Sequence, residues 1–161
     1  MFSYINKELP DLVSLYFPVS RQNISITGFS MGGHGALISA FKTGNYKSVS
    51  AFAPMGNPTK SENWGIKGFK FFFNNPEVEG LEYDATELVK NGKAHKVPLL
   101  VDFGVQDQFN DKLLPNNLRH QLIESNYDHI WKFRGGYNHS FWYVSSFIEE
   151  HLDFHAKYLN L

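Results

Sequence analysis

The sequence contains no cysteine, no long apolar run and no excess of charge of one sign. Without cysteine, the chain can form neither a disulfide framework nor a thiolate site, and it suits a reducing compartment. Its 15 Lys and Arg residues against 16 Asp and Glu residues leave a formal net charge of −1. That balance gives no electrostatic footprint for nucleic acid or for an anionic membrane. No segment is long and apolar enough for a transmembrane helix, and no repeat or linker divides the chain. We therefore expect a single domain over residues 1–161, no nucleic-acid or membrane partner and a cytoplasmic location.

The most informative segment is residues 28–33 (GFSMGG), which contains the pattern G-x-S-x-G. Residues 23–27 before it alternate and are β-branched, which predicts a strand. Residues 34–42 after it have helical spacing and end at Gly44-Asn45, which suits a helix C-cap. A serine at a tight turn between a strand and a helix is a nucleophile elbow. In that interpretation Ser30 is the nucleophile and the backbone N–H of Met31 faces a developing oxyanion. The alternative is a glycine-rich turn with an incidental serine.

The rest of the chain alternates between strand and helix patterns. Apolar residues at helical spacing predict a helix over 1–17, with a kink or restart at Pro10. The other predicted elements are strands over 47–54, 98–103 and 129–134, and helices from Asp84 (a capping box with Glu87), from Pro115 to about Ser125, and over 141–159. Residues 59–80 are predicted to be irregular and rich in aromatic side chains. This order predicts an α/β fold, a parallel sheet with helical crossovers.

A serine nucleophile needs a histidine to take its proton and an acid to orient that histidine. In hydrolases of this architecture the chain order is Ser, then Asp or Glu, then His, and each lies on a loop after the end of a strand. The strand at 98–103 leads to Asp107, and the strand at 129–134 leads to His139. We therefore expect Ser30, Asp107 and His139 to form a catalytic triad. Asp102 lies inside its strand, where we expect it to be hydrogen-bonded near the site.

Other histidines and aromatic residues have less specific patterns. His151 and His155 have a spacing that suits metal binding, but no third ligand accompanies them, so we expect packing residues and no metal. His34 either lines the site or packs its helix. The phenylalanines at 69–73 are expected to form core or a hydrophobic wall, with an acyl pocket or an oligomer contact as the alternative.

These motifs together resemble the S-formylglutathione hydrolases, also called esterase D, a branch of the α/β-hydrolases. The resemblance extends from Tyr4 to Leu159 and includes the segments GFSMGGHGAL at 28–37, KSVSAFAP at 47–54, YDAT at 83–86 and GYNHS at 136–140. It implies an α/β-hydrolase fold with Ser30, Asp107 and His139 as the triad. It also implies hydrolysis of S-formylglutathione to glutathione and formate, a step in formaldehyde detoxification, and of small acyl esters, without a metal or an organic cofactor.

The sequence departs from that family in three places. Phe29 stands where the family usually has a histidine before the serine, and the loop after Asp107 is about two residues shorter, within the range that loops tolerate. Only 22 residues precede the predicted elbow strand. They leave no room for the N-terminal strands of the fold or for the Gly-Leu-Thr loop that carries its second oxyanion donor. The chain therefore resembles the C-terminal half of an α/β-hydrolase domain, and we expect little or no activity from it alone.

Three hypotheses about function remain open at this point. The first is a serine esterase or thioesterase that acts on a small-molecule substrate. The second is a truncated, non-catalytic relative that acts as a binding or dimerising module. The third is an acyltransferase of the same fold, in which an alcohol replaces water. The sequence does not decide whether the chain forms a homodimer.

Overall fold

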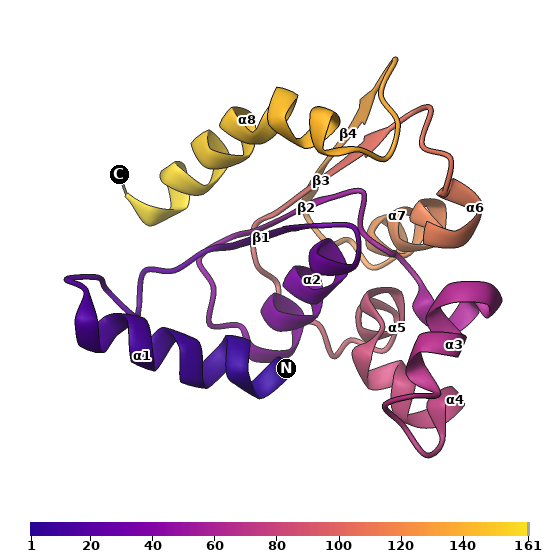
Figure 1. Cartoon of the computed structure of the whole chain (residues 1–161), viewed down its shortest axis with the longest axis horizontal. Coiled ribbons are helices and arrows are strands. Elements are labelled where there is room, and N and C mark those ends of the chain that lie inside the picture. Colours follow the sequence, from indigo (N-terminus) through magenta and orange to yellow (C-terminus); the bar gives the residue numbers. More distant parts are fainter. Residues whose placement is uncertain (161) are drawn as a thin grey trace.

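A parallel four-stranded sheet organises the computed structural model, which describes residues 1–160 (Figure 1). The strands are β1 (Ile26–Phe29), β2 (Val49–Phe52), β3 (Leu99–Gly104) and β4 (His129–Arg134), and they lie in the order β1-β2-β3-β4. All three pairings are parallel. The predicted parallel sheet with helical crossovers is therefore confirmed.

Helices cover both faces of this sheet. The longer ones are α1 (Leu9–Tyr16), α2 (Met31–Thr43), α5 (Ala85–Lys90), α7 (Pro115–Glu124) and α8 (Phe141–Leu159). Short helical segments are η1 (Tyr4–Glu8), η2 (Pro58–Lys60), η3 (Glu62–Ile66), α3 (Lys67–Phe69), α4 (Pro76–Glu79), η4 (Gly80–Tyr83) and α6 (Asn110–Leu113). In the residues that the structure describes, no helix has both the length and the apolar character needed to cross a membrane.

Most predicted elements agree with the structure, and the differences have local causes. Residues 59–80, predicted to be irregular, contain five short helical segments, which are too brief to show a helical repeat. The first strand begins at Ile26 rather than at Asn23, because the Asn23 N–H donates to the carbonyl of Ser20 in a turn. Pro10 lies in the first turn of α1, directly after the π-helical turn η1, so the predicted restart falls where one helical form gives way to the other. Asp84 caps α5 as predicted, accepting hydrogen bonds from the backbone N–H groups of Thr86 and Glu87.

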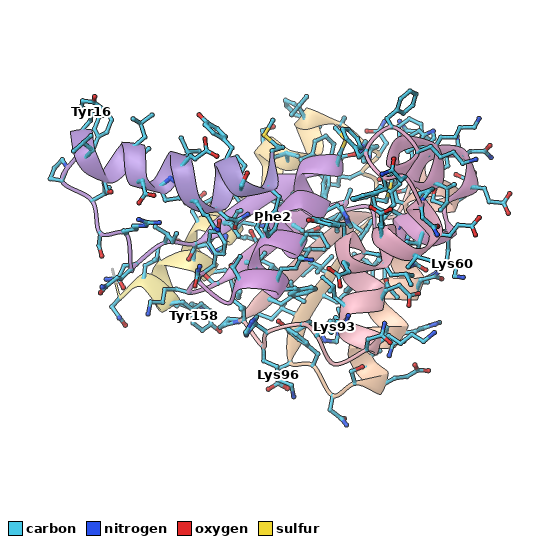
Figure 2. The ribbon with its side chains drawn as sticks, turned by 90° about the horizontal axis from the view of Figure 1, so that it is seen from below. Phe2, Tyr16, Lys60, Lys93, Lys96 and Tyr158 are labelled. Carbon is cyan, nitrogen blue, oxygen red and sulfur yellow. The ribbon has the colours of Figure 1, made fainter. Side chains whose placement is uncertain are left out.

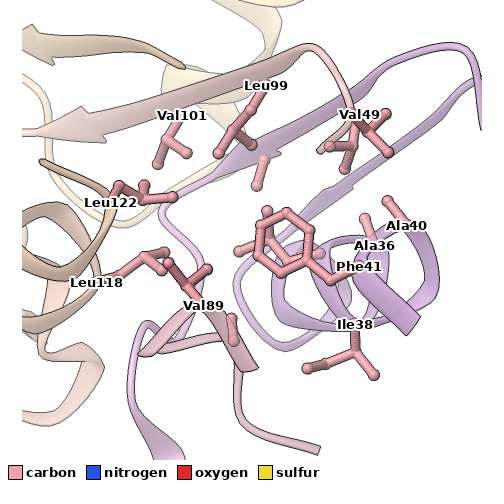
Figure 3. Packing of buried hydrophobic residues seen from close by; sticks show 14 of the residues in the cluster. Ala36, Ile38, Ala40, Phe41, Val49, Val89, Leu99, Val101, Leu118 and Leu122 are labelled. Atoms are coloured by element: carbon pink, nitrogen blue, oxygen red, sulfur yellow. The ribbon is translucent and has the colours of Figure 1, made fainter. Parts of the chain in front are cut away.

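The core lies between the sheet and the helices on one of its faces, while α8 covers the other face (Figure 1). Every residue of β2 and β3 is buried, as expected for central strands covered on both sides. Side chains of these strands pack against α2, α5 and α7 (Figure 3). The residues labelled there are Ala36, Ile38, Ala40, Phe41, Val49, Val89, Leu99, Val101, Leu118 and Leu122.

The N-terminal helices attach to this core mainly through their first turns. Phe2 makes an edge-to-face contact with Tyr83, with ring centroids 5.9 Å apart. The side-chain amide of Asn6 donates to Ser39 Oγ at 3.1 Å and accepts from the hydroxyl of Tyr46 at 2.9 Å. Figure 2 shows Tyr16 at the far end of α1, and its side chain is 71% exposed. The C-terminal end of α1 therefore contributes little to the core of the described chain.

Candidate active site

The turn between β1 and α2 holds Ser30 in an unusual backbone conformation. Ser30 has φ 57° and ψ −118°, which is strained for a residue with a side chain. Its N–H donates to the carbonyl of Phe52 on β2 at 2.8 Å. A Cβ on Gly28 would lie 2.3 Å from the carbonyl oxygen of Gly32, so this turn closes only with glycine at position 28. The result is a serine raised at the carboxyl edge of the sheet, where ligands bind in parallel α/β folds.

The side chains of Ser30, His139 and Asp107 form a continuous hydrogen-bonded chain. His139 Nε2 lies 2.8 Å from Ser30 Oγ, and His139 Nδ1 lies 2.7 Å from Asp107 Oδ2. With Asp107 ionised, Nδ1 donates its proton to the carboxylate and Nε2 is left free to accept from the serine hydroxyl. The side chain of Asp107 is fully buried and that of His139 is 9% exposed. These three residues, each following a different strand, are the ones that the sequence analysis selected.

Two glutamines join the loops that carry the acid and the base. Gln106 Oε1 accepts from the backbone N–H of Gly136 at 2.6 Å, and Gln108 Oε1 accepts from the backbone N–H of His139 at 3.2 Å. Asp107 Oδ1 also accepts from the N–H of Phe109 at 2.8 Å, so both of its oxygens are used. The sequence analysis did not assign these glutamines, because their bonds join loops about 30 residues apart in the chain.

Aromatic rings surround the imidazole of His139. Phe29 lies against it with a centroid separation of 4.5 Å and an interplanar angle of 33°, and Phe109 contacts it edge-to-face at 5.2 Å. Phe141 in turn contacts Phe29 at 5.3 Å. Phe29 is the residue that replaces the expected histidine of the resembled family, and here it limits the contact of the imidazole with solvent.

The backbone N–H of Met31 lies next to the nucleophile. Met31 is the first residue of α2, so its N–H has no partner within the helix. The partial positive charge of the helix N-terminus adds to the attraction of this N–H for an anionic oxygen. The side chain of Met31 is 80% exposed and leaves the approach to the turn open.

Behind the triad, Asp102 organises a buried polar network. Its Oδ2 accepts from Arg134 Nε at 2.8 Å, and its Oδ1 accepts from the hydroxyl of Tyr143 at 2.9 Å. Burial opposes the ionisation of Asp102, but the nearby His151 at 3.7 Å and the hydrogen bonds from Arg134 and Tyr143 outweigh it and lower its pKa. Burial, then the charge of Asp102, raises the pKa of Tyr143. Asp102 is therefore a strand residue hydrogen-bonded beside the site, as predicted, and it anchors the first turn of α8 just after His139.

The three other histidines that the sequence analysis considered pack against the sheet and neighbouring loops. His151 stacks on Phe52 with ring centroids 3.6 Å apart, and His155 is hydrogen-bonded to Ser48, just before β2, and to Ser50 on β2. Both ring nitrogens of His34 contact backbone carbonyl oxygens, those of Met55 and Tyr83. These contacts are packing roles, and within residues 1–160 no group of three His, Asp or Glu side chains could hold a metal ion.

The expectation for the phenylalanines at 69–73 is wrong for two of them. Phe71 and Phe72 are 87% and 80% exposed, because the chain turns at residues 70–72 and directs both side chains outward. Phe73 does pack inward, in contact with Phe69 and with Tyr83 at centroid separations of 5.3 Å each. A hydrophobic wall therefore forms from half of this cluster only.

Comparison with known protein families gives a match over residues 2–154 to the family described as "Putative esterase". The chain belongs to this esterase family. It is 44% identical over 163 residues to the S-formylglutathione hydrolases of Rattus norvegicus and Bos taurus, covering 99% of this chain and 57% of each relative. The chain thus spans little more than half the length of these curated relatives.

Solved structures place the esterase in the α/β-hydrolase fold. An S-formylglutathione hydrolase from Agrobacterium tumefaciens superposes with a TM-score of 0.92 at 34% identity, over 99% of this chain and 57% of that one. A fluorophosphonate-binding serine hydrolase of Staphylococcus aureus, FphF, superposes with a TM-score of 0.74 at 23% identity, over 96% of this chain and 62% of that one. The second likeness is evidence for the fold alone.

Proposed function

We propose that this chain carries the catalytic triad of a serine esterase of the S-formylglutathione hydrolase type. Ser30 is the nucleophile, His139 the general base and acid, and Asp107 the residue that orients the imidazole. The observation that supports this most strongly is the unbroken hydrogen-bonded chain from Ser30 Oγ through His139 to Asp107, on a strained strand-to-helix turn. The relatives named S-formylglutathione hydrolase support a small-molecule thioester as the substrate.

In the first half of the reaction, His139 Nε2 takes the proton of Ser30 as Oγ attacks the carbonyl carbon of the thioester. The carbonyl oxygen becomes an oxyanion that accepts a hydrogen bond from the N–H of Met31. When the tetrahedral intermediate collapses, the carbon–sulfur bond breaks, and the leaving thiolate takes the proton from His139. The products of this half are a formyl ester of Ser30 and free glutathione.

In the second half, His139 deprotonates a water molecule that attacks the formyl ester. Asp107 stabilises the imidazolium that forms in each half without itself becoming protonated. Collapse of the second intermediate returns the proton to Ser30 Oγ and releases formate. No step in this sequence needs a metal or an organic cofactor.

The experiment that tests the proposal is labelling of the chain with a fluorophosphonate, followed by peptide mapping. We expect the label on Ser30, no labelling of Ser30→Ala, and unchanged labelling of the control Ser20→Ala, an exposed serine. Turnover of p-nitrophenyl acetate and S-formylglutathione is then compared between this chain and a version extended to the length of its relatives. Absence of label at Ser30 in both versions would favour the non-catalytic binding module instead.

The cytoplasmic location and the substrate of the whole protein belong to the same proposal. The absence of cysteine supports a reducing compartment, and cell fractionation with detection of the native protein tests the location.

A further inference from the structure

Lys112 is held in a defined position beside the triad by two aromatic rings. Its Nζ lies 5.2 Å from the ring centroid of Trp64 and 5.5 Å from that of Phe109. The two rings contact each other at 4.8 Å with an interplanar angle of 49°. An ammonium over two ring faces is attracted by both, so this side chain is more confined than an ordinary surface lysine.

Phe109 connects this cation to the catalytic histidine. Its ring packs against Lys112 on the one hand and edge-to-face against the imidazole of His139 on the other, at 5.2 Å. Its backbone N–H donates to Asp107, which fixes the start of the segment that carries Lys112. The ammonium and the catalytic imidazole therefore contact the same phenylalanine ring.

Lys112 has no carboxylate partner, unlike Lys42, Lys132 and Arg134. Lys132 and Arg134 both pair with Glu150, and Lys42 pairs with Glu82 at 3.5 Å. Within residues 1–160, no Asp or Glu oxygen lies within 4.0 Å of Lys112 Nζ. An ammonium beside the site that is not neutralised by the protein is free to bind an anionic group of a ligand.

We propose that Lys112 is a specificity-determining residue that binds a carboxylate in the leaving group of the substrate. The inference rests on the proposed function, because it concerns the same site. In S-formylglutathione the sulfur belongs to a cysteine residue, and the next residue ends in a carboxylate. Two residues of extended chain span about 7 Å, so this carboxylate can reach groups that lie just beyond the rings around the triad. Lys112 therefore favours a peptide-like anionic thiol over a neutral one.

The effect of this contact is modest and depends on salt. Lys112 is partly exposed, so the ion pair competes with water and is screened by ions. An exposed ion pair of this kind changes affinity by a factor of about 2 to 5. The contact thus affects KM or Kd for charged substrates, while a neutral ester does not respond to it.

The test measures binding rather than turnover, so that it applies to this chain as it exists. Isothermal titration calorimetry gives the Kd of S-methylglutathione, a thioether that Ser30 cannot cleave, for the unmodified chain and for Lys112→Gln and Lys112→Arg. Lys157→Gln is the matched control, because Lys157 is exposed near the end of α8, about 24 Å along the helix from its first turn. A second ligand, S-methylglutathione with its glycine carboxylate amidated, isolates the charge.

We expect Lys112→Gln to raise the Kd of S-methylglutathione about 2- to 5-fold, and Lys112→Arg and Lys157→Gln to leave it unchanged. The difference should disappear with the amidated ligand and at 1 M salt, where the screening length is about 3 Å. Equal Kd values for the unmodified chain and Lys112→Gln, or no binding by the unmodified chain, would overturn the inference. Fluorophosphonate labelling of Ser30 in the unmodified chain tests the proposed function separately, so the two failures are distinguishable.

Discussion

Two histidines in this molecule each contact serine hydroxyls at similar distances, yet their surroundings differ. His139 Nε2 lies 2.8 Å from Ser30 Oγ, while His155 lies 2.7 Å from Ser48 Oγ and 2.8 Å from Ser50 Oγ. A serine–histidine hydrogen bond by itself therefore does not identify a catalytic pair.

The serine–histidine cluster around His139 and the one around His155 differ in the group that contacts the second ring nitrogen of the histidine. Asp107 occupies that position for His139, where it can stabilise an imidazolium. In the buried cluster a second serine takes its place: Ser50 donates to Thr27, so it accepts from His155 Nε2–H, and Nδ1 accepts from Ser48. Burial, followed by the neighbouring His151, lowers the pKa of His155 to about 4. The first cluster can move a proton, while the second joins α8 to β2.

The largest effect of a substitution in either cluster is expected on kcat, when the nucleophile Ser30 is removed. Ser30→Ala should reduce kcat by about 10⁶-fold in a version long enough for turnover, with little change in stability. The measurement is ester turnover together with the thermal unfolding midpoint. Substantial activity that survives in Ser30→Ala would show that another group performs the chemistry.

Replacing Asp107 and Asp102 one at a time separates orientation of the base from support of the fold. Asp107→Asn should lower kcat by about 10⁴-fold, because the amide leaves the imidazole in the wrong tautomer. Asp102→Asn should act mainly on stability, since Arg134 and Tyr143 lose a charged partner. Kinetics and thermal unfolding on both variants check this. The assignment of the acid is wrong if well-folded Asp102→Asn loses more kcat than Asp107→Asn.

In the cluster around His155, Ser48→Ala is expected to change the stability of the fold without changing the reactivity of Ser30. It leaves Nδ1 of His155 without its donor in a buried place, at a cost of about 1–3 kcal/mol. For a chain of this size the unfolding midpoint should fall by about 2–10 °C. Ser20→Ala is the control, and fluorophosphonate labelling of both variants should match the unmodified chain. An unchanged midpoint in Ser48→Ala would mean that water replaces the lost hydroxyl.

A pH dependence of stability is expected from His155. Its pKa in the folded chain, about 4, is lower than the ordinary 6.5, so the unfolded chain binds a proton that the folded chain does not. The contribution is fully present above about pH 6.5 and is lost as the pH falls toward 4. The groups that face His155 are Ser48 just before β2 and Ser50 on β2, with Phe154 and His151 on α8.

Unfolding midpoints measured from pH 7.5 to 4 check this pH dependence. The decline should be shallower in His155→Gln, because glutamine has no proton to gain in this range. An equally steep decline in that variant would assign the effect to His151, whose pKa burial also lowers, or to the carboxylates.

Local sequence patterns determined much of the fold and the choice of candidate site residues. The pattern of β4 and α8 predicted their bounds, because alternation and helical spacing are properties of neighbouring residues. The order Ser30, Asp107, His139 followed from where the strands end. Sequence also distinguished Asp107 from Asp102, since one lies after its strand and the other within it.

The tertiary structure alone decided the contacts between segments that are distant in the chain. Nothing local predicts that Gln106 binds the loop before His139, that Phe71 is exposed, or that Lys112 lies over Trp64. Each depends on how short turns bring separate segments together, and a turn of three or four residues has no period to detect. The serine–histidine clusters make the same point, because the residue types agree and only the packing places a carboxylate beside one histidine and a serine beside the other.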